Sequence, residues 1–507
     1  MYDILIKGGT IVDGSGAPRY TGDLAIRDGK IARIAREITE PAAQVLSVDG
    51  LVVSPGFIDM HSHSDSSFLR DDRCQSKLYQ GITTEVAGQC GSSPFPGREY
   101  ASMADFVQKC QDQNRRMATN LMLLVGHGTL RNAVMGSENR KATDDDIAAM
   151  GKLLEEDMRA GAWGLSLGLG YAPGVSSDQH ELNELGAVVA KYDGIVTSHM
   201  RNQGAGTPES LEEMFSIHRH SGVQVHIAHF KASGKANWGR AAEFIEIVHK
   251  AKRDGIKVSV DVYPYRASSS GITNCWPQWA IQGGREAAVQ RTMNEERPAL
   301  LEALGKRFRT PEDGDSLYVV TTNGTYPVAD GKTIGQIARE LGISMPEAVL
   351  EVTRHSRASA TCISFSMCES DVLTMLSQND FCIGTDGRGF SLNPEECEGK
   401  PHPRNYGTFP RFLRLVRENS FCSLETVVHR ITGLGKQIMA LPNRGLLKEG
   451  YVADITVFNP ETVTDLGTFD EPIRKNVGIE HVIIGGQFAL RDGEQTDVRN
   501  GQFLMKR

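Results

Sequence analysis

A repeating alternation of strand-like and helix-like segments is the feature that most constrains how this chain can fold. Apolar runs rich in β-branched residues recur through the middle of the sequence, and helix-like segments with apolar residues three or four apart lie between them. The eight runs are 52–59, 82–87, 120–125, 162–167, 194–199, 223–229, 256–262 and 381–386. The first seven begin about 30 to 40 residues apart, a spacing that suits a βα unit. Eight such units predict a (β/α)8 barrel.

The two ends of the chain predict a second, smaller domain. Short apolar runs broken by glycine fill the N-terminal stretch, and Asp28-Gly29 between two of them is a strong hairpin signal. Segments 453–458 and 479–487 have the same character. We therefore expect an α/β chain in which residues 1–60 and 441–507 form a small β-sandwich domain. The metal-dependent catalytic barrel would span residues 61–440.

The gap between the seventh and eighth strands is too long for one crossover. More than 110 residues separate the two runs, so we expect an insertion at about 267–375. It would contain helices near 333–341 and 345–355, where apolar residues follow a helical period. Trp276 and Trp279 also fall within it, either lining a pocket or packing the insertion.

Composition excludes several classes of function. The net charge of −8 and the lack of a basic run argue against a nucleic-acid partner. No run of 18 apolar residues occurs, so no membrane span is expected, and the N-terminus lacks a signal-peptide pattern. The nine cysteines form no CxxC pair, which favours a reducing compartment, the cytoplasm. The oligomeric state stays open.

Metal-ligating residue types gather at the predicted C-terminal ends of the strands, where barrel enzymes carry their active sites. Two histidines two residues apart on a strand point to the same side, so His61 and His63 can share an ion. Thiolate and imidazole are ligands that Zn²⁺ prefers, and a carboxylate can bind metal or move a proton. The candidate ligands are His61, His63, Cys90, His199, His229 and Asp386. Their coincidence at five strand ends predicts a metal centre.

Several motifs resemble those of a known family. The stretch Gly56-Phe57-Ile58-Asp59-Met60-His61-Ser62-His63 looks like the metal-binding start of the amidohydrolase superfamily. Further segments resemble its N-acyl-D-amino-acid deacylases, the D-aminoacylases: 88–91, 126–131, 198–201, 228–234, 261–265, 383–387 and 402–410. The match spans nearly the whole chain. Gln89 departs from the asparagine expected before Cys90, and this change could shift a hydrogen bond beside the ligand.

The resemblance implies zinc-dependent hydrolysis of N-acyl-D-amino acids, small molecules that would yield a carboxylate and a free D-amino acid. It implies a tightly held Zn²⁺ on Cys90, His199 and His229. A second, weaker metal site would use His61, His63 and Asp386, with Asp386 also passing a proton from water to the leaving amine. Around the scissile amide, the family pattern assigns Lys231 and Arg404 to the substrate carboxylate and places Tyr263 and Tyr171 near the reacting group.

Two other enzyme activities and a non-catalytic role compete with this interpretation. A cyclic-amide hydrolase similar to dihydroorotase or hydantoinase would use a carboxylated lysine on the fourth strand, and 162–168 has none. A D-residue dipeptidase cleaves the same kind of bond, and a non-catalytic barrel scaffold would be expected to lose ligands. We expect His127 to have a structural hydrogen-bonding role. His226, three residues before His229, is expected to point away from it and pack against the outer helices.

Overall fold

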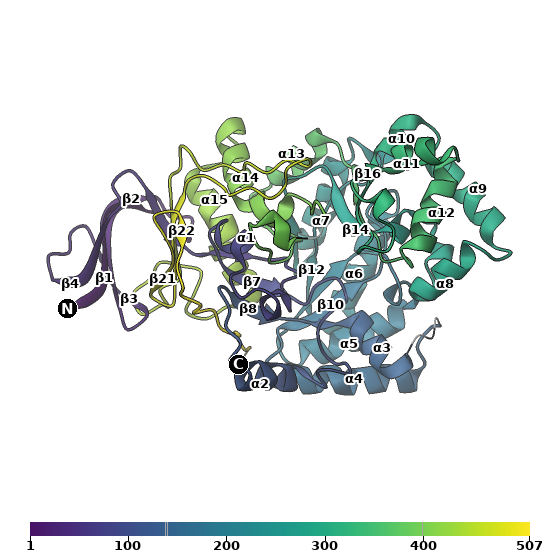
Figure 1. Cartoon of the computed structure of the whole chain (residues 1–507). Helices are drawn as coiled ribbons and strands as arrows, with labels where there is room; N and C mark the ends of the chain where they lie inside the picture. Colours follow the sequence, from purple (N-terminus) through teal and green to yellow (C-terminus); the bar gives the residue numbers. More distant parts are fainter. Residues whose placement is uncertain (137, 139, 398, 507) are drawn as a thin grey trace.

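The computed structural model describes residues 1–136, 138, 140–397 and 399–506 (Figure 1). Its parallel strands form a sheet of six and a sheet of three, an arrangement consistent with the predicted (β/α)8 barrel. In order around the ring, the strands are β6 (Phe57–Asp59), β7 (Ile82–Ala87), β8 (Asn120–Leu123) continued by β9 (Val125–Gly126), β10 (Gly164–Gly168), β11 (Ile195–His199), β12 (Gln224–Ile227), β13 (Val258–Val262) and β18 (Cys382–Ile383). The ring closes where the Met60 N–H donates to the Ile383 carbonyl, at 3.3 Å.

Helices cover the outside of the barrel and pack on alternate strand residues. Those between the first seven strands are α1 (Gln75–Leu78), α2 (Met103–Asp112), α3 (His127–Met135), α4 (Asp144–Arg159), α5 (Gln179–Ala190), α6 (Thr207–Ser221) and α7 (Ala241–Arg253). Outward strand residues such as Val225 and Val260 share one core with Met214 and Phe244 of the helices. The predicted helical periodicity therefore matches faces that are buried against the sheet.

The first predicted strand is in fact two strands. Residues 52–59 were expected to form one barrel strand, but β5 (Val52–Pro55) pairs with strands of the terminal sheet and only β6 belongs to the barrel. The break falls at Gly56, where a Cβ atom would lie 2.2 Å from Oγ1 of Thr83. A side chain cannot fit at this close approach, and the glycine lets the chain pass from one domain to the other.

Strands from both ends of the chain form one nine-stranded sheet. They are β1 (Tyr2–Ile11), β2 (Tyr20–Arg27), β3 (Lys30–Ala35), β4 (Ala42–Ser47), β5, β19 (Ile455–Phe458), β20 (Ile479–Ile484), β21 (Gln487–Arg491) and β22 (Glu494–Gln495). Side chains from distant strands of this sheet, such as Ile26 and Ile483, share one core, so the sheet packs on itself. Helices α14 (Arg404–Asn419), α15 (Leu424–Ile431) and α16 (Gly433–Met439) connect β18 to it.

The predicted insertion between β13 and β18 has its own core. Its sheet has the order β14 (Ser268–Gly271), β17 (Thr361–Ser364), β15 (Leu317–Thr321) and β16 (Lys332–Thr333). The helices are α8 (Gly284–Arg291), α9 (Arg297–Arg307), α10 (Pro311–Asp315), α11 (Ile334–Leu341) and α12 (Met345–His355), and α13 (Glu369–Leu376) leads back to the barrel. Trp276 is buried in this core, whereas Trp279 is 41% exposed. Within the described residues, no helix has the length and apolar character needed to cross a membrane.

Candidate metal centre

The side chains predicted as ligands of the tight metal site converge where three barrel strands end. The sulphur of Cys90 lies 3.6 Å from Nε2 of His229 and 4.0 Å from Nδ1 of His199. These two imidazole nitrogens are 2.9 Å apart. The three donor atoms thus lie within 4.8 Å of one another. One sulphur and two nitrogens at this spacing fit the preferences of Zn²⁺ and could hold one ion with a position left open.

A second group of candidate ligands adjoins the first. Nε2 of His61 lies 3.3 Å from the Cys90 sulphur and 3.6 Å from Oδ1 of Asp386. The same carboxylate oxygen is 3.1 Å from Nε2 of His63. The structure therefore brings all six predicted ligands into one cluster, in which His63 and His199 are half-buried and Cys90 and His61 border both groups.

Three residues of the cluster have a left-handed backbone conformation. The φ angles of Cys90, His229 and Asp386 are 56°, 37° and 49°. Each lies two or three residues beyond the last residue of its strand, β7, β12 or β18. Residues other than glycine rarely adopt this conformation, and such strain concentrates at functional sites. It directs all three side chains into one cluster, which simple strand alternation would not do.

The charges in the cluster favour a thiolate at Cys90. Burial alone would raise the pKa of this thiol, but the charge of His61 and hydrogen bonds from His199 and His229 lower it well below its usual range. Burial likewise opposes protonation of His61, yet the charges of Cys90 and Asp261 raise its pKa well above the usual value. The thiolate is the form of cysteine that binds metals, so the site is prepared for a cation.

Asp386 is held as an ionised carboxylate by its neighbours. Burial would raise its pKa, but the charges of Arg404 and His229 and the hydrogen bond with His63 lower it well below the usual range. Nη1 of Arg404 lies 2.6 Å from Oδ2 of Asp386, and both side chains are almost fully buried. One carboxylate oxygen therefore faces the histidines and the other faces the arginine.

Asp261, to which the sequence pattern gave no role, orients two of the candidate ligands. Its carboxylate accepts a hydrogen bond from the His229 backbone N–H at 2.8 Å and lies 3.4 Å from Nδ1 of His61. This contact leaves Nε2 of His61 directed at the other ligands. Carboxylates that bind the far nitrogen of a metal-binding imidazole fix its tautomer and ring orientation.

The expectation that His226 packs against the outer helices is wrong. Its Nε2 lies 2.9 Å from the Asp261 carboxylate and its Nδ1 lies 2.8 Å from the Ser259 hydroxyl. The neighbouring Val225 and Ile227 are the residues that join the core beneath the helices. Counting back from His229 failed because His229 lies beyond the end of β12 with a left-handed backbone, where strand alternation no longer applies.

A buried charge network beside the cluster was also missed. Nζ of Lys77 donates to Asp59 at 2.8 Å and to the Thr385 hydroxyl at 2.6 Å, and it lies 3.3 Å from Glu85. Asp59 in turn accepts hydrogen bonds from the backbone N–H groups of Thr385 and His61. The network fixes the end of β6 against the turn after β18. No spacing pattern identifies Lys77, because it comes from the four-residue helix α1.

With this geometry established, comparison with known proteins identifies the family. The model of the amidohydrolase family matches residues 44–489. The chain belongs to the amidohydrolase family. A D-aminoacylase from Alcaligenes xylosoxydans xylosoxydans is 34% identical over all of this chain and 98% of its own. The crystal structure of an N-acyl-D-glutamate deacylase from Bordetella bronchiseptica, complexed with zinc and a phosphonate mimic of the tetrahedral intermediate, has a TM-score of 0.84 at 32% identity, with 99% of each chain covered. A D-aminoacylase structure with a binuclear metal centre has a TM-score of 0.86, at 32% identity over both full chains.

Two cationic side chains of this amidohydrolase, Lys231 and Arg404, lie beside the cluster. Nζ of Lys231 lies 3.1 Å from Nδ1 of His229 and 5.3 Å from the centre of the Tyr263 ring. The Arg404 guanidinium lies 5.2 Å from the same ring. Nε of Arg404 and the Tyr263 hydroxyl are buried and have no hydrogen-bond partner among the residues that the structure describes. Unpaired buried donors are unusual, and their convergence indicates a place for a polar ligand.

The two tyrosines named in the sequence analysis lie on different sides of the cluster. The Tyr171 ring is 4.7 Å from the His199 ring, on the loop after β10. Tyr263 lies among Lys231 and Arg404, whereas the Tyr265 hydroxyl donates to the Pro403 carbonyl at 3.4 Å. Of the two tyrosines in this Tyr-Pro-Tyr segment, Tyr263 is therefore the one beside the two cations.

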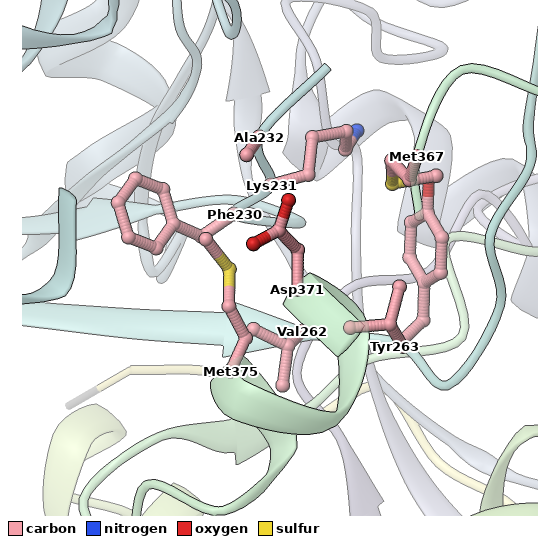
Figure 2. Close-up of a pocket in the computed structure, with 9 residues that line it drawn as sticks. Phe230, Lys231, Ala232, Val262, Tyr263, Met367, Asp371 and Met375 are labelled. Carbon is pink, nitrogen blue, oxygen red and sulfur yellow. The ribbon is translucent and has the colours of Figure 1, made fainter. Parts of the chain in front are cut away.

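A cavity adjoins the side of Lys231 and Tyr263 that faces the outer helices (Figure 2). Its remaining lining is mostly apolar: Phe230, Ala232, Val262, Met367, Val372 and Met375, with one carboxylate, Asp371. The Asp371 carboxylate already has hydrogen-bond partners, since it accepts from backbone N–H groups at the start of α7. The cavity thus offers apolar contacts next to a lysine.

Two further expectations concern residues around the centre. His127 is buried with Nε2 2.7 Å from Glu181, which also pairs with Arg131, so it hydrogen-bonds within a separate network. Gln89, the departure from the family pattern, accepts a hydrogen bond from the Thr197 hydroxyl at 2.7 Å and donates to the Met60 carbonyl at 3.2 Å. Its longer side chain therefore links β7 to the neighbouring β6 and to β11 across the barrel.

Proposed function

We propose that this amidohydrolase uses zinc to hydrolyse the amide bond of N-acyl-D-amino acids, releasing a carboxylate and a free D-amino acid. The proposal is supported by full-length similarity to a D-aminoacylase and to an N-acyl-D-glutamate deacylase whose structure contains zinc. The free state of all nine cysteines suits a reducing compartment such as the cytoplasm.

One observation carries the proposal: a thiolate–imidazole cluster lies directly beside a buried pair of cations. Cys90, His199 and His229 could hold the tight zinc ion. His61 and His63, which both lie close to Oδ1 of Asp386, could hold a second, weaker one with that carboxylate. When bound, zinc polarises the amide carbonyl and activates a water molecule for attack. A site with both zinc ligands and a cationic pocket is suited to an amide that carries a nearby carboxylate.

The substrate carboxylate is expected to bind where Arg404 and Lys231 face Tyr263. The unpaired Nε of Arg404 and the unpaired Tyr263 hydroxyl can both donate to it. Arg404 provides a planar fork suited to a carboxylate, and Lys231 adds a point charge. Because these groups are buried, binding excludes water and fixes the distance between the carboxylate and the scissile amide.

Asp386 is placed to move the proton. Its Oδ1 faces the histidines and its Oδ2 faces Arg404, so it lies between the ligand cluster and the carboxylate pocket. In the proposed reaction it takes a proton from the attacking water and gives it to the leaving amine. Tyr171 beside His199 and Tyr263 on the opposite side limit the space around the scissile group.

A cyclic-amide hydrolase and a D-residue dipeptidase are the alternatives to test. The fourth barrel strand, β10, reads Gly-Leu-Ser-Leu-Gly and provides no lysine for a bridging carbamate. A dipeptidase would need room and charge for a free amino group on the acyl side.

The test is a release assay over a library of N-acetyl and N-formyl derivatives of D- and L-amino acids, with dipeptides and a hydantoin included and zinc measured on the same sample. We expect bound zinc and turnover of D-configured acyl amino acids. Preferred hydrolysis of L-enantiomers, of dipeptides or of the hydantoin would contradict the proposal.

A further inference from the structure

Two hydrogen-bond donors meet at one atom of a candidate zinc ligand. Nε2 of the Gln203 amide and Nζ of Lys231 each lie 3.1 Å from Nδ1 of His229. An imidazole nitrogen without a proton has a single in-plane lone pair, so it cannot fully accept from both. At least one of these two contacts, from Gln203 or from Lys231, must therefore change when His229 acts as a metal ligand.

Zinc binding requires Nδ1 of His229 to donate a hydrogen bond and not to accept one. His229 turns Nε2 toward the cluster, 3.6 Å from the Cys90 sulphur. A neutral imidazole that binds a metal through Nε2 carries its proton on Nδ1, and this N–H needs an acceptor. A lysine ammonium offers no acceptor, and the nearby Asp261 carboxylate already accepts from the His229 backbone N–H and contacts His226.

Gln203 can satisfy this N–H by a rotation of its amide. The oxygen and nitrogen of a glutamine amide are nearly equal in size, so turning the group places Oε1 where Nε2 stands. The loop holds the residue in place, because the Gln203 backbone carbonyl accepts a hydrogen bond from the Ser233 N–H at 2.8 Å. This bond ties the loop after β11 to the segment that follows His229.

We propose that Gln203 is a positioning residue that accepts a hydrogen bond from Nδ1–H of His229 and so fixes this histidine for metal binding. The inference rests on the proposed zinc-dependent function and adds a residue outside the six ligands.

The same rotation of the Gln203 amide releases Lys231 from its contact with His229. Once Nδ1 of His229 carries its proton toward Gln203, the Lys231 ammonium loses its contact there and lies beside the Tyr263 ring, where Arg404 also points. It is then available to a substrate carboxylate. Metal loading and carboxylate binding are thereby linked through one imidazole.

The test measures zinc affinity without substrate, by competition with a chelator, alongside kcat and KM. Gln203→Met keeps the side-chain length but has no strong acceptor, and we expect zinc to bind about 10- to 100-fold more weakly. Gln203→Glu supplies a stronger acceptor, so zinc should bind at least as tightly as in the wild type. Because the new carboxylate also attracts Lys231, KM should rise in this variant.

Gln179→Met is the matched control. The Gln179 side chain donates to Asn183 and to the Glu213 carbonyl on the outer helices, so its loss should leave zinc affinity unchanged. Equal zinc affinity in wild type and Gln203→Met, or weaker binding in Gln203→Glu, overturns the inference. If Gln203→Met does not fold, Gln203→Glu decides alone. Failure of the wild type to bind zinc would instead contradict the proposed function.

Discussion

Two buried, histidine-containing regions of this amidohydrolase differ in what surrounds the imidazole. His127 is the first residue of α3 and lies 2.7 Å from Glu181 of α5, and Arg131 pairs with the same carboxylate, also at 2.7 Å. The candidate metal centre instead brings four imidazoles, a thiol and a carboxylate together at the strand ends, with their donor atoms in overlapping groups. In the first region opposite charges are paired within the protein, and in the second several lone-pair donors face one another.

The difference shows that buried polar groups can stabilise the fold in one region and can be placed to bind a ligand in another. In the first region the Glu181 carboxylate is paired with His127 and Arg131, although Nδ1 of His127 and Nε of Arg131 have no hydrogen-bond partner among the described residues. In the candidate metal centre the atoms that contact one another, such as the Cys90 sulphur and Nε2 of His229, also lie within 4.8 Å in groups of three that could hold a cation.

Removing a ligand of the tight site should have the largest effect. Cys90→Ala and His229→Ala are each expected to lose most bound zinc and nearly all activity, because three protein ligands are needed for a tight site. Elemental analysis and kcat on the same preparation check this. Cys110→Ala is the control, since this thiol is buried on α2 away from the cluster and burial raises its pKa to about 11. Full zinc and normal turnover in either ligand variant would show that the assignment is wrong.

The proton-transfer role of Asp386 predicts a large loss of rate with metal retained. Asp386→Asn keeps the shape of the side chain and leaves Cys90, His199 and His229 in place. Tight zinc should remain, whereas kcat should fall by about two to four orders of magnitude, the usual range for a general acid–base group. Turnover close to that of the wild type in a folded, zinc-loaded variant would exclude the role.

Substitution of Arg404 tests the proposed carboxylate pocket beside the candidate metal centre. Loss of one partner of a buried charge pair costs about 2 to 5 kcal/mol, so Arg404→Ala should lower kcat/KM by about 30-fold to several thousand-fold. Zinc content should not change. The kcat/KM of Arg404→Lys should lie between those of Arg404→Ala and the wild type, because lysine keeps the charge but lacks the planar fork.

Substrates with an amidated carboxyl group provide the control for this pocket. They should be poor substrates of the wild type, and Arg404→Ala should hardly change the kcat/KM measured with them. If amides and free acids were hydrolysed equally well by the wild type, the pocket would not bind a carboxylate.

The network around His127 should behave in the opposite way. Glu181→Gln leaves the buried Arg131 without its counter-charge, and breaking a buried pair typically costs about 3 to 5 kcal/mol of stability. Denaturant unfolding should show this loss, while zinc content and kcat of the folded fraction stay at wild-type values. A specific loss of zinc in this variant would contradict the separation of the two regions.

The sequence was sufficient for the architecture because periodic patterns report directly on buried faces. All eight apolar runs contain barrel strands, and the helices predicted near 333–341 and 345–355 correspond to α11 and α12. The error at residues 52–59 arose because one apolar run supplies strands to two domains. In the sequence, only Gly56 marks the break between the two strands. Its close approach to Thr83 is known only from the structure.

The site was predictable where residue type and strand end coincided, and not where a role depends on contacts. The six candidate ligands stood out as histidine, cysteine or aspartate after apolar runs. Asp261 had a detectable signal, a lone acidic residue on the inner face near the end of β13. Gln203 and Lys77 had none, since one lies on a loop and the other on a short helix. Their roles come from partners distant in sequence or from neighbouring loops.

The most direct test of the account is X-ray absorption at the zinc edge on the wild-type enzyme loaded with one equivalent of zinc. We expect a shell that contains one sulphur at about 2.3 Å together with nitrogen or oxygen ligands at about 2.0 to 2.1 Å, as a site of one cysteine and two histidines requires. The sulphur component should disappear in any zinc that Cys90→Ala retains. A shell of nitrogen and oxygen alone in the wild type would contradict the assignment of Cys90, and with it the proposed centre.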